Sequence, residues 1–288
     1  MPPDWSTVAI AVPHPALRRP GVAMAGFRQR RPATWDIAMV AHPSVTVLLN
    51  LAADDDGLVC GAGTSRRCGS VVAGLLPGDL RATGRVVDCL QIRLDPVASA
   101  AAFGGPDLTG VLVSLDELWG RDATRLEDRL RAASGWDERF AIATSFLARR
   151  LDAPPVDPEV AHTWRRTHAG RGRVSVEGLA EEVGWSRKRL WSRFRGQLGI
   201  SPKRAARLVR FDHAAHLLAA GRPAAEVAAE SGYVDQSHLH REVRAFAGLT
   251  PSAVAAAPWL AIDDTAWPAS VNRGDRRPHT PATNGGSP

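Results

Sequence analysis

The sequence predicts an α+β protein with a β-rich N-terminal half and an all-α C-terminal half built from two related helical units. Short apolar, β-branched runs separated by Gly, Pro and Asp fill the chain up to about residue 112. From about Ser114 onward the apolar residues recur at helical spacing. In addition, the segment 183–202 returns in altered form at 231–251. Strands first and helices second indicate the α+β class.

The N-terminal half is expected to hold short antiparallel strands. The runs SVTVLLNLA (44–52) and SVVAGLLPG (70–78) are apolar and rich in β-branched residues. Further along, Leu90, Ile92 and Leu94 alternate with polar residues, which is the period-2 pattern of a half-buried strand. Strands at this spacing favour a small barrel or sandwich.

Helices are expected from about residue 114 to 152. Ser114 and Glu117 have the spacing of a capping box, in which each side chain accepts a hydrogen bond from the other residue's backbone N–H. Apolar stripes at helical spacing follow at Leu126, Leu130, Phe140, Thr144 and Leu147. These patterns predict a helical hairpin behind the strands.

Four regions are therefore expected along the chain. Residues 1–152 form an N-terminal domain that is β-rich and becomes helical from about 114. The stretch APPVDP begins a stiff linker over 153–164. Residues 165–257 form the helical domain. A tail over 258–288, rich in Pro, Gly and Ser, is expected to be disordered.

Positive charge is concentrated in the helical half. Between Val160 and Ala253 there are 16 Lys and Arg against 8 Asp and Glu, a net charge of +8, while the whole chain carries +6, so the remainder carries −2. A basic segment joined to a nearly neutral one is typical of nucleic-acid binding. A solvated basic surface accounts for the charge equally well, so charge alone leaves both interpretations open.

Membrane and disulfide-rich classes are disfavoured. No run of 18 apolar residues occurs, and the N-terminus carries an acid and prolines where a signal peptide has basic residues and an apolar core. We therefore expect a cytoplasmic protein without a membrane partner. Cys60, Cys68 and Cys89 lack CxxC spacing, so neither a disulfide framework nor structural zinc is expected.

The repeated segment contains one extra residue in its later copy. At an offset of 48, Gly184 corresponds to Gly232 and Trp185 to Tyr233. Beyond the extra residue the offset is 49, and the matched pairs are Leu190 and Leu239, Phe194 and Val243, Gly199 and Gly248, and Pro202 and Pro251. Two related helical units therefore lie in tandem.

Each copy is predicted to be a helix-turn-helix. In the first, a short helix over 176–183 ends before Gly184, where the turn needs a positive φ. Ser186 then caps a second helix that turns Leu190 and Phe194 inward. The second copy repeats the pattern with Val227, Ala228, Gly232, Leu239 and Val243.

A further helix connects the two units. Ser201 precedes Pro202 and Thr250 precedes Pro251, and a capping hydroxyl before Pro at the first helical position starts a helix in each case. The helix after Pro202 runs until Gly221. A duplicated helical pair joined in this way is what contact with two successive major grooves of double-stranded DNA requires.

The outward faces of the two second helices carry the candidate DNA-binding residues. Long polar side chains in a major groove meet base edges, Arg or Lys pairing with guanine and Gln with adenine. The candidates of the first unit are Ser186, Arg187, Lys188, Arg189, Trp191, Ser192 and Arg195. The arginines among these, and Arg193 beside them, suit contacts with phosphates. Those of the second unit are Gln236, Ser237, His240 and Arg241. A polar solvent face is the alternative interpretation.

This constellation resembles the AraC/XylS family of bacterial transcription regulators. The resemblance rests on GWSRKRLWSRFRGQLGISP and on SGYVDQSHLHREVRAFAGLTP, and it covers roughly residues 165–256. It implies that each unit inserts its second helix into a major groove and that the intervening helix sets their separation. One departure is Val243, where an aromatic residue is usual in the family; Phe246 is expected to take over part of its packing.

In the N-terminal half, the strand DCLQIRLDP and the later helical stretch SGWDERFAIATSFLARRL resemble, more loosely, parts of the sensor domains attached to such regulators. The resemblance implies a barrel or cupin-like sandwich that binds a small-molecule effector, forms a homodimer, or does both, with RNA polymerase as a further partner. No HxH metal pattern occurs, and neither a cofactor nor a metal is expected. Trp35, His42 and Trp119 could line a pocket, although each also suits ordinary core or surface.

Two other functions remain open at this point. A DNA-repair protein that transfers alkyl groups uses a reactive cysteine, and Cys68 lies beside Arg66 and Arg67, as activation of a thiol requires. The four-cysteine zinc site of that class is missing. A purely architectural DNA-binding protein would not need an N-terminal domain of this size.

A zinc site is also not expected. His213 and His216 can share a helix face, but a third zinc ligand is missing.

Overall fold

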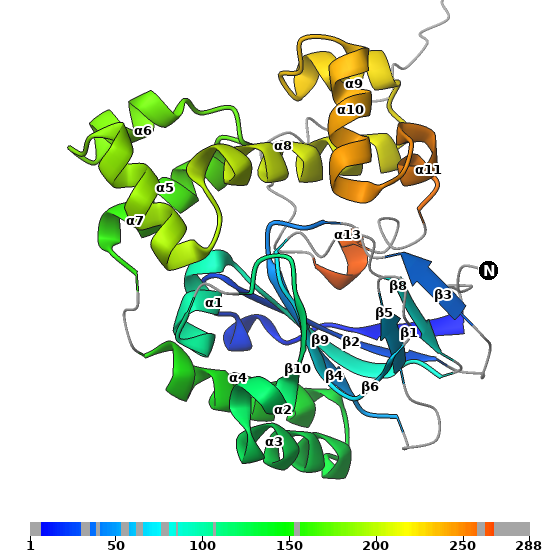
Figure 1. The fold of residues 1–288 in the computed structure, drawn as a ribbon. Helices are drawn as coiled ribbons and strands as arrows, with labels where there is room; N and C mark the ends of the chain where they lie inside the picture. Colours follow the sequence, from blue (N-terminus) through cyan, green and yellow to red (C-terminus); the bar gives the residue numbers. More distant parts are fainter. Residues whose placement is uncertain are drawn as a thin grey trace, which may run out of the picture.

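The computed structural model describes residues 7–29, 35–38, 41–52, 58–61, 66–75, 81–84, 86–105, 108–152, 156–257 and 263–267. Figure 1 shows a β-rich N-terminal domain and a helical C-terminal domain, which confirms the predicted class. No helix within these ranges is both long and apolar enough to cross a membrane.

The strands form two antiparallel sheets. One has six strands in the order β1-β2-β9-β4-β7-β10, and the other has four in the order β3-β8-β5-β6. The strands of the six-stranded sheet are β1 (Val8–Ala11), β2 (Val22–Gln29), β4 (Val45–Asn50), β7 (Val71–Ala73), β9 (Asp88–Leu94) and β10 (Leu112–Ser114). Those of the other are β3 (Trp35–Ala38), β5 (Leu58–Gly61), β6 (Arg66–Cys68) and β8 (Arg81–Gly84).

The two faces of the six-stranded sheet meet different partners. On β9, Leu90, Ile92 and Leu94 are fully buried on the face that packs against the N-terminal helices, as the alternation predicted. We call this the helical face. Cys89 points the other way and joins Phe27 of β2 in a separate apolar cluster. We call that the second face.

The N-terminal helices cover the helical face. They are η2 (Pro15–Leu17), α1 (Pro96–Phe103), α2 (Leu115–Trp119), α3 (Arg121–Ala132) and α4 (Trp136–Leu151). The stripe on α3 and α4 is buried at Leu126, Leu130, Phe140 and Leu147, whereas Thr144 is only half-buried and Ala143 and Phe146 complete the packing. The capping box is not formed, because the Ser114 hydroxyl donates to the Asp116 carboxylate instead of capping α2.

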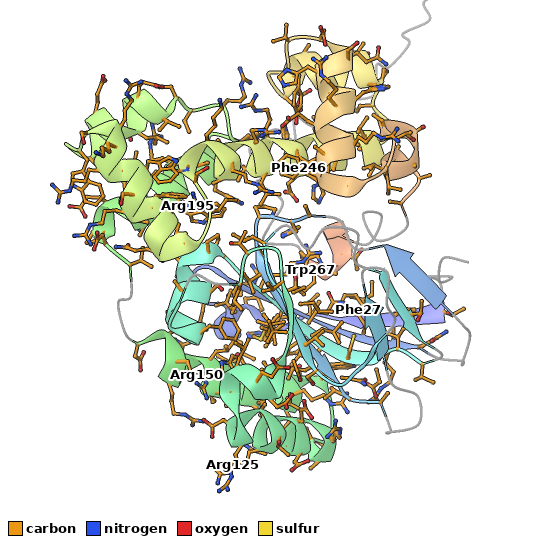
Figure 2. The ribbon with its side chains drawn as sticks, in the orientation of Figure 1. Phe27, Arg125, Arg150, Arg195, Phe246 and Trp267 are labelled. Carbon is orange, nitrogen blue, oxygen red and sulfur yellow. The ribbon has the colours of Figure 1, made fainter. Side chains whose placement is uncertain are left out.

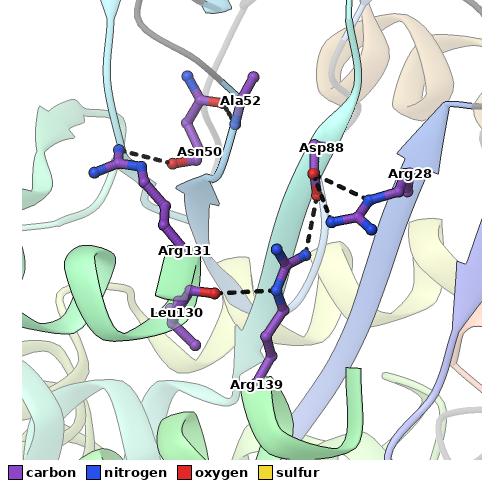
Figure 3. A network of polar contacts seen from close by, with 7 residues as sticks. All are labelled: Arg28, Asn50, Ala52, Asp88, Leu130, Arg131 and Arg139. Atoms are coloured by element: carbon purple, nitrogen blue, oxygen red, sulfur yellow. Dashed lines mark hydrogen bonds and ion pairs between the residues drawn. The ribbon is translucent and has the colours of Figure 1, made fainter. Parts of the chain in front are cut away.

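A carboxylate on β9 ties the helical hairpin to the sheet. Asp88 accepts hydrogen bonds from Arg28 of β2, at 2.8 and 3.1 Å, and from Arg139 of α4, at 3.2 Å (Figure 3). Arg139 is itself buried and also donates to the Leu130 carbonyl at the end of α3, at 3.0 Å. One carboxylate thus joins two strands of the sheet to both helices of the hairpin.

The helical domain is built around one long helix, α8 (Pro202–Ala219). Its other helices are α5 (Pro158–Ala169), α6 (Val176–Glu182), α7 (Arg187–Leu198), α9 (Ala224–Glu230), α10 (Gln236–Ala247) and α11 (Pro251–Ala255). Helices α5, α7, α9, α10 and α11 all contact α8. The side chains of α8 that are buried in this arrangement include Leu208, Phe211 and Leu218.

Helix α5 crosses the border that the sequence placed between linker and helical domain at 164/165. It begins at Pro158, because Asp157 precedes a proline at the first helical position. Val160 and Trp164 on α5 are buried, and α5 packs on α8. Residues from 158 onward therefore lie in the helical domain and not in a linker; residues 153–155 lie outside the described ranges.

The expectation of a disordered tail is wrong for one short segment. Helix α13 (Asp263–Ala266) lies against the second face, and Ala266 and Trp267 are buried there. Figure 2 shows Trp267 beside Phe27 of β2. The composition of the tail, rich in Pro, Gly and Ser, predicted disorder. A single tryptophan can nevertheless bury enough apolar surface to dock a short segment. Residues 258–262 and 268–288 lie outside the described ranges.

Candidate nucleic-acid interface

The first helical unit consists of α6, a glycine turn and α7. Gly184 in the turn has a φ of +66°, which an L side chain adopts only at a cost. The Ser186 hydroxyl accepts a hydrogen bond from the Arg189 backbone N–H at 3.2 Å and so caps α7, as predicted. Leu190 and Phe194 are fully buried on its inner face. The turn, the cap and the buried pair together fix the outward face of α7.

The exposed side of α7 and the capping residue before it hold the candidates of the first unit. Each of them is exposed: Ser186, Arg187, Lys188, Arg189, Trp191, Ser192 and Arg195. Trp191 is 46% exposed, which is unusual for an indole in a folded chain. Arg195 lies over the Trp191 ring at 5.2 Å from its centroid. A large aromatic surface with a cation stacked on it is therefore presented to solvent.

Two further arginines of the first unit are held in place by neighbours. Arg187 pairs with Glu177 of α6 at 3.1 Å, across the turn. Arg189 lies 4.5 Å above the ring of Trp185, the residue after the turn glycine. These contacts position two guanidinium groups at the start of α7, where a helix N-terminus also favours an anion.

The second unit repeats this geometry with α9 and α10. Gly232 has a φ of +73°, and Asp235 caps α10 by accepting a hydrogen bond from the His238 backbone N–H at 2.6 Å. Leu239 and Val243 are fully buried. The candidates of this unit are all exposed: Gln236, Ser237, His240 and Arg241. Gln236 and His240 lie one turn apart with their Nε2 atoms at 3.4 Å.

An ion pair fixes α10 on the linking helix. Arg207 of α8 donates two hydrogen bonds to Glu242 of α10, at 2.6 and 3.0 Å, and Glu242 is buried. Phe246 stacks on Phe211 of α8 with ring centroids 5.2 Å apart. Phe246 thus packs into the α8 interface beside Val243, as expected from the departure at that position.

Tyr233 occupies the position after the second turn glycine. Its ring is buried between Arg210, 5.6 Å from the ring centroid, and His238, whose ring meets it edge-on at 5.2 Å. Burial raises the pKa of the Tyr233 hydroxyl. Tyr233 corresponds to Trp185 of the first unit. In both units the aromatic residue directly after the turn glycine packs against an arginine, Arg189 on Trp185 and Arg210 on Tyr233.

Polar contacts join α5 to the first unit. Glu182 at the end of α6 accepts hydrogen bonds from Arg166, at 2.9 and 3.0 Å, and lies 3.1 Å from His162 Nε2. These partners hold the pKa of the Glu182 carboxyl down at about 2. Helix α5 is therefore attached to the first unit by charge as well as by its buried stripe.

Val234, which is strongly exposed, is not among the candidates that the sequence predicted. Val234 is 89% exposed and is the extra residue of the second copy, placed between Tyr233 and the capping Asp235. It therefore stands at the entrance of α10, next to the candidate base-reading residues. The one-residue difference between the two repeats was the signal that could have identified it.

The N-terminal domain contacts the helical domain at α8 and at α7. His42, before β4, has its Nε2 atom 3.6 Å from Asp212 Oδ1 of α8 and 3.2 Å from an Arg93 nitrogen. A small hollow where α1 meets α7 is lined by Val45, Leu75, Ser99, Leu108, Gln197 and Leu198 among others. Trp119 belongs to the core, stacked on Phe103 with ring centroids 5.1 Å apart, and neither Trp119 nor His42 is among the residues that line this hollow. The Trp35 side chain lies outside the described residues.

In the part of the chain that the structure describes, no three His, Cys, Asp or Glu side chains gather as a metal site. His213 lies 3.4 Å from an Arg171 nitrogen, and His216 Nδ1 lies 2.8 Å from the Asp212 carbonyl. The two imidazoles therefore have different neighbours, although they share a helix.

Comparison with known proteins gives one sequence match and several structural likenesses. Residues 179–257 match the family model described as a helix-turn-helix domain. No curated protein sequence matches the chain. The C-terminal domain of AraT, a response regulator from Geobacillus stearothermophilus, is 23% identical over 35% of this chain and 86% of that one, with a TM-score of 0.33.

Two structures of ToxT align with most of the chain at low identity. ToxT from Vibrio cholerae O395 is 10% identical over 85% of this chain and 98% of that one, with a TM-score of 0.46. ToxT from Vibrio cholerae strain SCE256 with a bound unsaturated fatty acid is 10% identical over 83% and 96%, with a TM-score of 0.43. With two capped helical units on one linking helix and the family match over 179–257, the C-terminal region of this chain is a helix-turn-helix domain.

Proposed function

We propose that the protein is a sequence-specific DNA-binding transcription regulator that inserts α7 and α10 into two successive major grooves. The observation that carries the proposal is the repeated geometry: each helix is capped, buried on one side and exposed on the other, and both pack on α8. One rigid linking helix holds two such helices at a constant separation, which suits two grooves on one side of a duplex. The protein acts in this proposal by binding and not by catalysis.

The exposed residues divide into two proposed roles. Base edges are read by exposed side chains in the first half of each helix. These readers are Lys188, Trp191 and Ser192 on α7, and Gln236, Ser237, His240 and Arg241 on α10. Phosphates are contacted by Ser186 and by the arginines of α7, namely Arg187, Arg189, Arg193 and Arg195. The stacking of Arg189 and Arg195 on indole rings supports a positioning role.

The N-terminal domain is proposed to control DNA binding through a small-molecule effector and to form a homodimer. Its contacts with α8 and α7, through His42 and through α1, give it a physical route to the helical domain. A dimer of an asymmetric tandem reader binds two copies of one site. RNA polymerase is the further partner that a bound activator would contact.

The domain division is proposed with one change from the sequence prediction. The N-terminal domain ends at about residue 152, and the helical domain begins at Asp157, which precedes α5. The helical domain ends near Ala257, which is buried after α11. Farther along the chain, Trp267 packs on the N-terminal domain.

Alkyl transfer by a reactive cysteine receives no support from the described residues. Cys89 is buried, and burial raises the pKa of its thiol to about 12, the opposite of what a nucleophile at neutral pH requires. Cys68 lies on β6 opposite Leu58, and its side chain is outside the described residues. We therefore keep the regulator as the single proposal.

Binding-site selection from a random DNA library tests the proposal. The full-length protein should enrich a bipartite motif, and fluorescence anisotropy should show that combined Lys188→Ala and Arg241→Ala lowers affinity for it at least tenfold, since each reader is worth about 1–3 kcal/mol. Arg125→Ala is the control, because it removes one charge from an exposed position on α3 of the N-terminal domain. Failure to enrich any motif, or equal losses in both variants, would contradict the proposal.

A further inference from the structure

The second face of the six-stranded sheet is covered by the chain's own C-terminal segment. Trp267 is 2% exposed, and Ala266 is fully buried. The Trp267 ring lies 6.3 Å from that of Phe27, centroid to centroid, at an interplanar angle of 50°. The guanidinium carbon of Arg93 lies 4.1 Å from the Trp267 ring centroid, so the indole meets an aromatic ring from β2 and a cation from β9.

The rest of the cluster is apolar and comes from four strands. Its buried members besides Phe27 are Val8 of β1, Ala25 of β2, Val71 and Ala73 of β7, Cys89 of β9, and Val87 just before β9. The docked indole thus meets aliphatic side chains, a thiol and a stacked cation. This specific fit separates residues 263–267 from a tail that merely touches the surface.

We propose that residues 263–267 are an intramolecular strap: Trp267 docks on the second face, closes it, and ties the second helix-turn-helix unit to the N-terminal domain. The strap comes after α11 in the chain, and Val254 of α11 is fully buried in the helical domain. Ala257 and Asp263 are six residue steps apart, which span at most about 20 Å of extended chain. While Trp267 is docked, Ala257 therefore stays within about that distance of Asp263.

The strap also adds to the proposed function, on which this part of the inference rests. Arg93 contacts both Trp267 and His42, and His42 lies beside Asp212 of the linking helix. The strap and the α8 contact thus meet at one residue of β9. Release of Trp267 would therefore change these two connections between the sheet and the DNA-binding domain, and DNA binding and strap docking should be coupled reciprocally.

Thiol labelling of Cys89 measures whether the strap is docked. The thiol is buried in the cluster that Trp267 covers, and burial raises its pKa to about 12, so it should react slowly in the closed state. The experiment uses the full chain with Cys60→Ser and Cys68→Ser, so that a chromogenic disulfide reports one thiol. Trp267→Ala should raise the labelling rate at least about tenfold by opening the face.

Thr265→Ala is the matched control, since Thr265 is on the same segment but exposed. It should leave the rate within about twofold of the parent. Equal rates in the Trp267→Ala and Thr265→Ala proteins would refute the docking. If the serine background fails to fold, hydrogen exchange of β2 and β9 in the natural sequence gives the same comparison, with faster exchange expected only in Trp267→Ala.

A DNA fragment carrying the selected bipartite motif tests the coupling separately. In the parent, bound DNA should change the Cys89 labelling rate at least about fivefold, and in Trp267→Ala it should change it less than twofold. Anisotropy in the same samples shows whether DNA is bound. Bound DNA with an unchanged rate overturns the coupling alone, whereas no binding overturns the proposed function and leaves the docking result standing.

Discussion

Arg207 of α8 and Glu242 of α10 form a two-pronged ion pair, with N–O distances of 2.6 and 3.0 Å, and Glu242 is only 7% exposed. This pair orients the second recognition helix on the linking helix from inside the domain. The charge-assisted bonds also raise the pKa of the Arg207 guanidinium. It is a structural contact on the face of α10 that points away from the candidate DNA-binding residues.

Loss of that pair should destabilise the protein without altering base preference. Glu242→Ala leaves the arginine without its buried partner and should lower the free energy of unfolding by about 2 kcal/mol. This is less than the roughly 3–5 kcal/mol lost when a fully buried ion pair is broken, because Arg207 is partly exposed. Urea denaturation followed by circular dichroism measures it. Glu226→Ala breaks the exposed pair with Arg222 and should cost less than about 0.5 kcal/mol. Equal costs for the two variants would show that burial contributes nothing.

The N-terminal border of the helical domain can be tested with two fragments. A fragment from Asp157 to Ala257 retains Val160 and Trp164, which are buried in the domain, and should fold and bind DNA. A fragment that starts at Arg165 lacks both and should lose at least about 3 kcal/mol of stability, as expected when large buried side chains are removed. Thermal melting distinguishes them. Identical melting would place the border where the sequence alone suggested.

Arg241 should read one base pair. It is exposed on α10, on the side opposite Leu239 and Val243, where a guanidinium can pair with both acceptors of guanine. Arg241→Ala should cost about 1–3 kcal/mol on the preferred site and flatten the preference at one position, with unchanged melting. Affinities for all single-base variants of the site provide the measurement. A uniform loss across sequences would make Arg241 a phosphate contact.

Arg195 should contact phosphate and not bases. It lies over the exposed Trp191 ring near the end of α7, where its charge can reach the DNA backbone. Arg195→Ala should weaken binding to every sequence alike and lower the slope of log affinity against log salt by about one unit. Arg195→Lys keeps the charge and should restore most of the slope. A sequence-dependent loss would instead assign Arg195 to base reading.

The spacing between half-sites should be strict. Both units pack on α8, so an insertion of about 5 bp turns one half-site to the opposite side of the duplex and should reduce affinity to that of a single unit. An insertion of about 10 bp returns both half-sites to the same side of the duplex but increases the distance between them. Because α8 holds the two units at one separation, binding should stay weak. Mobility shifts on the three DNAs give the comparison. Unchanged affinity in the 5 bp variant would contradict the two-groove arrangement.

The sequence by itself determined the parts of this protein that local signals control. Gly184 and Gly232 require turns, Ser186 caps a helix, and the spacing of Leu190 and Phe194 marks a buried face. Each signal acts over a few residues, so it survives without knowledge of the rest of the chain. The same holds for β9, where alternation identified the buried face correctly.

Only the tertiary structure decided the contacts between distant residues. Trp267 meets Phe27, Arg207 pairs with Glu242, and α5 packs on α8 although the proline-rich stretch before it predicted a linker. Such contacts depend on which surfaces folding brings together, and that is a property of the whole packed chain and not of any short pattern.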